Sequence, residues 1–228
     1  MDWFSVAIQQ ATTHRRPFLH TQLNSIFTEQ LLHDMLRFFP NEQDMFLVDK
    51  GTRDQGVRHH IFLNERLEQQ IATPESATFW FLFWQSVVCE AHHIKQSAIQ
   101  YFQQWQLFPG IAETDIKLGV RLVNESLPYS MAPHIDQAFK LAVLVVFLDT
   151  DEPTSSQGTQ LFNKQPDGTF RSVSRLPFEC NSGVFMPRVR GSWHGGAWHG
   201  SGHRKTLHLY FFKASGVGEP NHPHPIYV

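Results

Sequence analysis

The stretch that constrains the architecture most strongly is Lys140–Leu148, which reads Lys-Leu-Ala-Val-Leu-Val-Val-Phe-Leu. It has the length of a β-strand, is rich in β-branched residues, and is followed by the polar turn sequence Asp149–Pro153. It lacks the alternation of apolar and polar residues that marks a strand with one face in water. We therefore predict a strand that is buried on both faces.

Shorter strand candidates lie on either side of this run and are separated by turn residues such as Pro166-Asp167-Gly168. They are Gly119–Val123, Thr159–Phe162, Val184–Pro187 and Thr206–Phe212. The first hundred residues instead show helical patterns. Phe27–Phe39 places apolar residues three and four apart, and Pro40 stops that run.

A second helix is expected to begin at Thr73-Pro74, to run through Val88 and to continue toward Phe102. Helices followed by several short strands predict an α+β chain in which N-terminal helices pack against a β-sandwich or jelly roll. We expect a single domain over residues 1–228. It would have a mainly helical part at about 1–115, a strand-rich core at about 116–215 and a C-terminal tail at 216–228.

Composition limits the class of protein. A hydrophobic fraction of 41% over 228 residues is enough for a packed core, which excludes a disordered chain. The net charge of −2 comes without a basic stripe, so we expect no nucleic-acid partner. Cys89 and Cys180 are too few for a disulfide framework and are expected to be reduced, buried thiols. No secretory signal or membrane-length apolar run is visible, so we expect a cytoplasmic protein with no membrane partner.

A metal site is indicated by Pro133-His134-Ile135-Asp136, where an imidazole and a carboxylate stand two positions apart and face the same way on an extended segment. His194, within Ser192–Gly196, is the best candidate for a third ligand. Two histidines and one carboxylate on one face of an octahedron are typical of iron(II) enzymes that activate oxygen. His199 is the rival, but it would leave too little chain to turn into the next strand.

Arg204 follows His194 by ten residues. If Gly202–Tyr210 is a strand, Arg204, Thr206 and His208 share one of its faces. A guanidinium beside a hydroxyl is well suited to bind a carboxylate, because the planar fork can bond both oxygens. A dicarboxylic cosubstrate could therefore chelate the metal at one end and reach Arg204 and Thr206 at the other.

The segment from about Leu118 to Phe212 resembles the 2-oxoglutarate- and iron(II)-dependent oxygenase superfamily. The resemblance rests on the order His-x-Asp, a distal His, and an Arg ten residues later that is followed by x-Ser/Thr. Further stretches are similar to a sparsely characterised bacterial branch of that superfamily. They are Arg16–His20, Pro128–Asp136, Lys140, Gly158–Phe162, Asn181–Phe185 and Ser192–Gly195.

The resemblance implies a double-stranded β-helix core of the jelly-roll or cupin-like kind, with Fe(II) held by His134, Asp136 and His194. It also implies that Arg204, helped by Thr206, binds 2-oxoglutarate, and that O2 is a co-substrate. The implied reaction hydroxylates a substrate C–H bond and releases succinate and CO2. The carboxylate of Asp136 argues against halogenation, because halogenating relatives carry a small residue there.

One departure from the relatives concerns the residues before the His-x-Asp strand. Asn124–Pro128 replaces a Gly or Tyr that is often found there, which leaves the second partner of the cosubstrate open. Tyr129 and Lys140 are candidate substrate residues. Their simpler interpretations are a core tyrosine with a bonded hydroxyl and a solvated strand start; Lys140 could instead face an anionic substrate.

Two other functions remain open at the level of sequence. The first is a cupin-type metal enzyme without a keto-acid cosubstrate, which would need the three ligands but not Arg204. The second is a non-catalytic binding protein on the same barrel. A small-molecule substrate is favoured, while its identity and the oligomeric state are not readable from the sequence.

Overall fold

The computed structural model describes residues 3–48, 54–151 and 156–216. Its strands form one antiparallel network in the order β1-β2-β9-β6-β11-β5-β10-β7-β8, and β4 pairs with both β3 and β5. The strands are β1 (Thr12–His14), β2 (His20–Leu23), β3 (Phe46–Leu47), β4 (Asp54–Phe62), β5 (Ile116–His134), β6 (Lys140–Thr150), β7 (Gln160–Lys164), β8 (Phe170–Arg175), β9 (Ser182–Pro187), β10 (His194–Trp198) and β11 (His203–Lys213).

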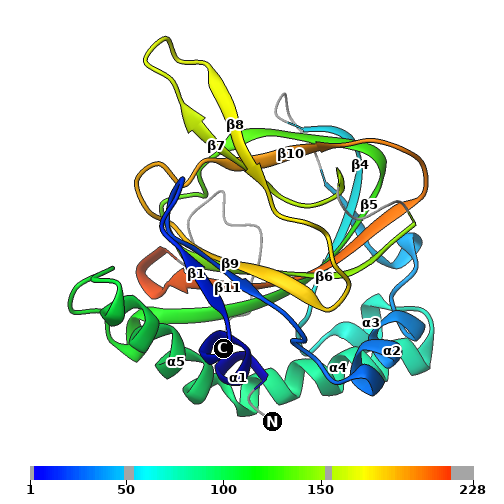
Figure 1. The fold of residues 1–228 in the computed structure, drawn as a ribbon. Helices are drawn as coiled ribbons and strands as arrows, with labels where there is room; N and C mark the ends of the chain where they lie inside the picture. Colours follow the sequence, from blue (N-terminus) through cyan, green and yellow to red (C-terminus); the bar gives the residue numbers. More distant parts are fainter. Residues whose placement is uncertain (1–2, 49–53, 152–155, 217–228) are drawn as a thin grey trace.

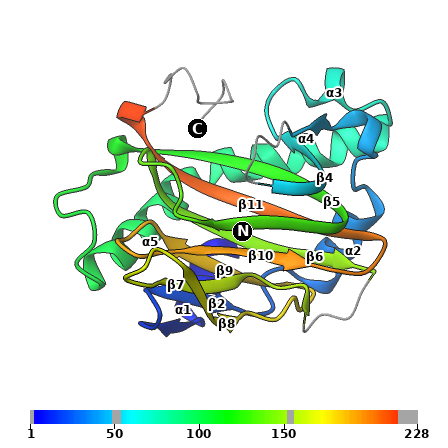
Figure 2. The same ribbon diagram turned by 90° about the horizontal axis from the view of Figure 1, so that it is seen from above.

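The long strand β5 belongs to two layers of this network. Residues Ile116–Ser126 pair with β11, whereas Tyr129–His134 pair with β10 on the other side of the barrel. Figures 1 and 2 show the sheet curling over itself so that β10, β7 and β8 lie opposite β6, β9 and β11. The core is a double-stranded β-helix, which confirms the predicted fold class.

The five α-helices of the described residues pack beneath the β6–β9–β11 side of the sheet (Figure 1). They are α1 (Trp3–Gln9), α2 (Glu29–Arg37), α3 (Leu67–Gln70), α4 (Pro74–Cys89) and α5 (Ala91–Gln104). The Thr28 hydroxyl accepts a hydrogen bond from the Leu31 N–H and so caps α2. The second predicted helix begins at Pro74 as expected, but it is divided into α4 and α5 at Glu90.

Strand β6 is buried along Leu141–Leu148, as its composition predicts. Leu144 and Val146 pack into the cluster under the helices, whereas Val143 and Val145 pack into a second cluster inside the barrel. Burial on both faces explains why this strand carries no alternation of polar and apolar residues.

Several features depart from the sequence expectations. The N-terminal part is not only helical, since β1, β2 and β4 extend the sheet, and β8 and β10 were not foreseen as strands. Cys89 and Cys180 are free but exposed, so their predicted burial is wrong: one ends α4 and the other lies in the turn before β9. Most of the predicted tail, 217–228, lies outside the described residues. Among the described helices, none is both long and apolar enough to cross a membrane.

Phe185 joins the sheet to the helices, because its ring packs against aromatic rings on α1, α5 and β11. Each ring-centroid distance falls within the roughly 4.5–7 Å that favours aromatic pairs. The partners, with ring-centroid distances, are Phe4 at 5.7 Å, Tyr101 at 5.0 Å, Phe102 at 6.3 Å and Phe211 at 5.6 Å.

We predict that Phe185→Ala lowers the free energy of unfolding by about 3–5 kcal/mol, measured by urea denaturation. Val173→Ala on β8, where Val173 is 47% exposed, should change it by less than about 0.5 kcal/mol. Equal losses in the two variants would contradict this account of the core.

Candidate metal centre and cavity

The register of β11 on β5 determines which side chains face the barrel interior. Arg204 stands opposite Glu125, and His208 stands opposite Arg121. Because alternate residues of a strand share a face, these side chains line the cavity while Leu207 and its alternate neighbours pack under the helices. Arg204, Thr206 and His208 thus lie on one face, as the strand pattern predicts.

The structure brings His134, Asp136 and His194 together at the ends of two paired strands. His134 ends β5, and its Cα partner His194 begins β10. One ligand atom from each of the three residues lies within 4.8 Å of the others, and His194 Nε2 is 3.9 Å from Asp136 Oδ2. The rival His199 is exposed.

Each histidine of the cluster is oriented by a backbone carbonyl two residues before it. His134 Nδ1 lies 3.1 Å from the Ala132 oxygen, and His194 Nδ1 lies 3.0 Å from the Ser192 oxygen. A carbonyl can only accept, so Nδ1 carries the proton and Nε2 keeps a free lone pair. Burial, together with His194, lowers the pKa of His134 to about 3, which keeps this imidazole neutral.

Two basic side chains hold Asp136, one at its carboxylate and one at its backbone oxygen. Lys140 Nζ donates to Oδ1 at 2.5 Å, and Arg188 Nε donates to the Asp136 backbone oxygen at 2.7 Å. Burial alone would raise the pKa of Asp136, but Lys140 and His194 outweigh it and hold that pKa well below its usual value. Lys140 is therefore not a solvated strand start. It orients an ionised carboxylate.

Gly195 allows β10 to approach β5 beside the cluster. A Cβ at this position would lie 2.6 Å from the Met131 oxygen and 3.0 Å from the Ala132 oxygen. Any larger residue would push the two backbones apart. The contact fixes the distance between the strand ends that carry His134 and His194.

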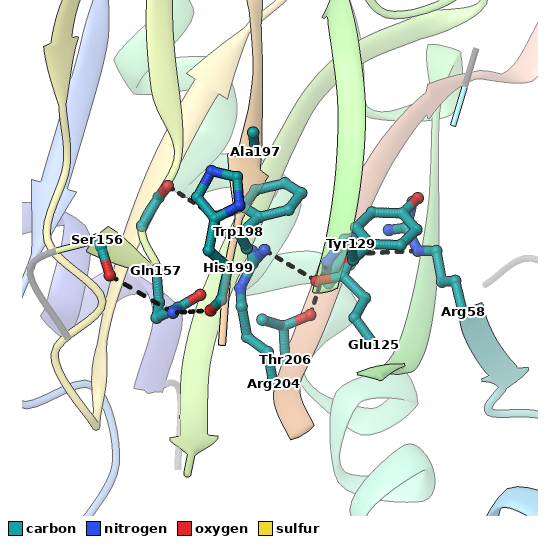
Figure 3. Close-up of polar contacts among 12 residues, drawn as sticks. Arg58, Glu125, Tyr129, Ser156, Gln157, Ala197, Trp198, His199, Arg204 and Thr206 are labelled. Carbon is teal, nitrogen blue, oxygen red and sulfur yellow. Dashed lines mark hydrogen bonds and ion pairs between the residues drawn. The ribbon is translucent and has the colours of Figure 1, made fainter. Parts of the chain in front are cut away.

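Arg204 is buried in the cavity lining, and Figure 3 shows it between Trp198 and Glu125. Its guanidinium lies 3.9 Å from the centre of the Trp198 ring, and its Nη1 is 2.9 Å from Glu125 Oε2. The other oxygen of Glu125 is 3.4 Å from Arg58 Nε. Burial opposes the charge of Arg58, but the attractions of Glu125, Tyr129 and Tyr210 together outweigh it and raise the pKa of Arg58. Two buried guanidinium groups thus share one carboxylate.

A chain of hydrogen bonds runs from β5 to the hydroxyl of Thr206. Arg121 Nη2 donates to His208 Nδ1 at 3.2 Å, which makes that nitrogen an acceptor and leaves the proton on Nε2. His208 Nε2 then donates to Thr206 Oγ1 at 3.0 Å. Burial, reinforced by Arg121, lowers the pKa of His208 well below its usual value, so the ring is neutral. Figure 3 shows the Thr206 hydroxyl beside the carboxylate of Glu125.

Tyr129, a candidate substrate residue, is 2% exposed and stacks on the Trp198 ring with centroids 5.6 Å apart. Its hydroxyl is 3.5 Å from Arg58 Nη1. It does not belong to the described cavity lining. The structure therefore places Tyr129 as a core tyrosine with a bonded hydroxyl, behind Trp198 and Arg58.

The cavity has a volume of about 730 Å³, and its lining includes the His134–Asp136–His194 cluster and Arg204. This volume lies within the roughly 300–1,000 Å³ that is usual for small-molecule sites. Sequence reasoning missed Arg58 and Arg121, which also line it. A usable signal existed for Arg121. It alternates with Val120 and Leu122 in a strand and so lies on the opposite face from them, and the pairing with β11 turns that face toward the cavity.

No protein-family model matches the sequence, and no curated protein sequence matches it. Solved structures do. A prolyl-4-hydroxylase from Pseudomonas putida is similar with a TM-score of 0.53 and 11% identity, over 92% of this chain and 98% of that one. A prolyl hydroxylase from Trichoplax adhaerens, in complex with a hypoxia inducible factor peptide fragment, gives 0.51 and 11%, over 86% and 84%. The non-haem α-ketoglutarate-dependent epimerase SnoN of nogalamycin biosynthesis gives 0.51 and 12%, over 92% and 82%. The resemblance noted in the sequence is thus confirmed at the level of the fold.

The shared carboxylate gives a prediction about stability. Glu125→Gln should lower the free energy of unfolding by about 3–5 kcal/mol, because it leaves two buried guanidinium groups without an acid. The measurement is urea denaturation at neutral pH. Glu113→Gln, which breaks an exposed pair with His92, should leave the unfolding curve unchanged. A Glu125→Gln protein as stable as the wild type would contradict the proposed charge balance.

Proposed function

We propose that this protein is a 2-oxoglutarate-dependent iron(II) dioxygenase that hydroxylates a C–H bond of a small molecule. The observation that carries the proposal is the convergence of His134, Asp136 and His194 on the wall of a cavity that also contains Arg204. The shared fold supports it, since the similar structures include an α-ketoglutarate-dependent enzyme.

The donor set fits iron(II). Two neutral imidazoles and one ionised carboxylate suit this ion and leave further coordination positions for exchangeable ligands. Here both Nε2 atoms have free lone pairs, and Lys140 engages only one oxygen of Asp136. Bound iron would supply the redox centre at which 2-oxoglutarate, O2 and a substrate C–H are converted to succinate, CO2 and an alcohol.

The residues around the cluster would prepare it for this ion. The backbone carbonyls of Ala132 and Ser192 fix the tautomers of the two imidazoles. Lys140 holds the Asp136 carboxylate in one orientation and keeps it ionised. At neutral pH Asp136 is ionised and His134 is neutral, which are the forms in which these two side chains bind a metal ion.

Arg204 and Arg58 would anchor the distal carboxylate of 2-oxoglutarate. With Glu125 between them, the two guanidinium groups carry one uncompensated positive charge. A second carboxylate would bring the cluster to balance, which is the condition under which buried charges are tolerated. The Thr206 hydroxyl, on the same face of β11 as Arg204, would contribute a further contact to this carboxylate. Arg58 would then be the second partner that the sequence left open, beside the expected Thr206.

One observation favours a second candidate function. Glu125 already pairs with Arg204, as it would in a metal enzyme that uses no keto acid. The two functions differ in whether O2 uptake depends on 2-oxoglutarate and yields succinate. A non-catalytic binding protein would show neither.

Replacement of the distal ligand tests the metal site. We predict that His194→Ala weakens Mn(II) binding, measured by calorimetry, by at least about 100-fold and abolishes succinate formation with Fe(II). His199→Ala is the matched control. Because His199 is exposed, this variant should leave Mn(II) binding and succinate formation unchanged. The assignment fails if the two variants bind Mn(II) equally well.

Replacement of Arg204 tests whether this residue binds the distal carboxylate of 2-oxoglutarate. Arg204→Gln should weaken 2-oxoglutarate binding to the Mn(II) protein by an amount on the order of 2–5 kcal/mol, because one charge-assisted pair is lost. Pyruvate has the same chelating end but no distal carboxylate, so its affinity should not change. Arg171→Gln on exposed β8 serves as the surface control. An equal loss for pyruvate and 2-oxoglutarate would show that Arg204 does not contact the distal carboxylate.

A further inference from the structure

Arg121 is a cation of the cavity wall without a counter-ion among the described residues. Its guanidinium carbon lies 4.9 Å from the centre of the Tyr210 ring and 5.5 Å from that of Phe62. Its Nη2 donates to His208, whereas its buried Nε has no hydrogen-bond partner, and no described carboxylate lies within ion-pair distance of the guanidinium. Burying a guanidinium that contacts only aromatic rings and a neutral imidazole costs free energy, unless an anion pairs with it.

Lys140 lies against the same aromatic ring. Its Nζ is 4.8 Å from the centre of the Tyr210 ring and pairs with Asp136. If Asp136 binds a metal, its negative charge is shared with the ion, and the ammonium of Lys140 is then only partly compensated. Two cations therefore gather at Tyr210, at the metal end of the cavity.

A charge count of the cavity leads to the same conclusion. Its lining contains four cations and two anions: Arg58, Arg121, Lys140 and Arg204, against Glu125 and Asp136. Iron(II) would add two positive charges and the 2-oxoglutarate dianion would remove two. The loaded cavity would still hold two positive charges in excess, and a neutral substrate would leave them unbalanced.

Arg121 is poorly placed to take the distal carboxylate of the cosubstrate together with Arg204. It precedes Glu125 by four positions on β5, which corresponds to roughly 13 Å of strand. It stands instead beside His208, Tyr210 and Lys140. Arg121 and Arg204 thus occupy different positions along one strand face, although Arg121 also interacts electrostatically with Arg58 and Glu125.

We propose that the substrate carries an anionic group, a carboxylate or a phosphate, and that Arg121 binds this group with Lys140 beside it. The inference rests on the proposed function, which supplies the metal and the cosubstrate. Arg121 can present a planar pair of N–H donors to either anion. It acts as a specificity-determining residue, because it selects acidic molecules over neutral molecules of the same shape.

The test uses the protein loaded with Mn(II) and saturating 2-oxoglutarate, with inorganic phosphate and acetate as probes. Paramagnetic broadening of the ³¹P or ¹³C resonance reports a probe that is bound near the metal. We expect saturable broadening for at least one probe, and the stronger probe identifies the anion class. Arg121→Gln should weaken that binding at least tenfold, Arg121→Lys should retain part of it, and Arg171→Gln should match the wild type.

Each other outcome is informative. The inference is overturned if neither probe saturates with the wild-type protein, a measurement that does not depend on how the variants fold. It is also overturned if Arg121→Gln binds the probes normally, or if it weakens 2-oxoglutarate binding instead, which would make Arg121 a cosubstrate residue. If the wild type binds Mn(II) but not 2-oxoglutarate, the proposed function fails first, which separates the two failures.

Discussion

The register between β5 and β11 is the constraint on which the cavity depends. The pairing runs without a break from His203 opposite Ser126 to Lys213 opposite Ile116. Side chains alternate between faces, so a slip of one residue would turn Arg204 and His208 toward the helices and bring Leu207 into the cavity. The apolar face of β11 packs into the cluster under the helices and fixes this register. The charges of the cavity are thus positioned by hydrophobic packing on the opposite side of the same strands.

Much of the fold could be predicted from local patterns. The run Lys140–Leu148 gave a strand buried on both faces, and Phe27–Phe39 gave a helix, because each pattern is set by neighbours in the chain. β10 escaped prediction because it contains Gly195 and Gly196, which have low strand propensity. It is a strand because it pairs with β5 and β7, which are distant in sequence.

The candidate site also contains some residues that the sequence predicts and others that it does not. His134, Asp136, His194 and Arg204 could be singled out from spacing and from a family resemblance. The partnership of Arg58 with Glu125 could not, because it exists only where β4 lies beside β5. Such cross-strand ion pairs leave no pattern in the sequence of either strand. They nevertheless determine the charge of the cavity, and therefore which ligands it can bind.

The close approach at Gly195 has a consequence for the way the cluster responds to a metal ion. The backbones that carry the two imidazoles are in contact, so neither ring can move far without the other. Folding itself therefore supplies the ligand geometry, and little conformational entropy remains to be lost when an ion arrives. The affinity of such a preorganised centre is set by the match between ion and donor atoms, because almost no free energy of binding is needed to bring the ligands together.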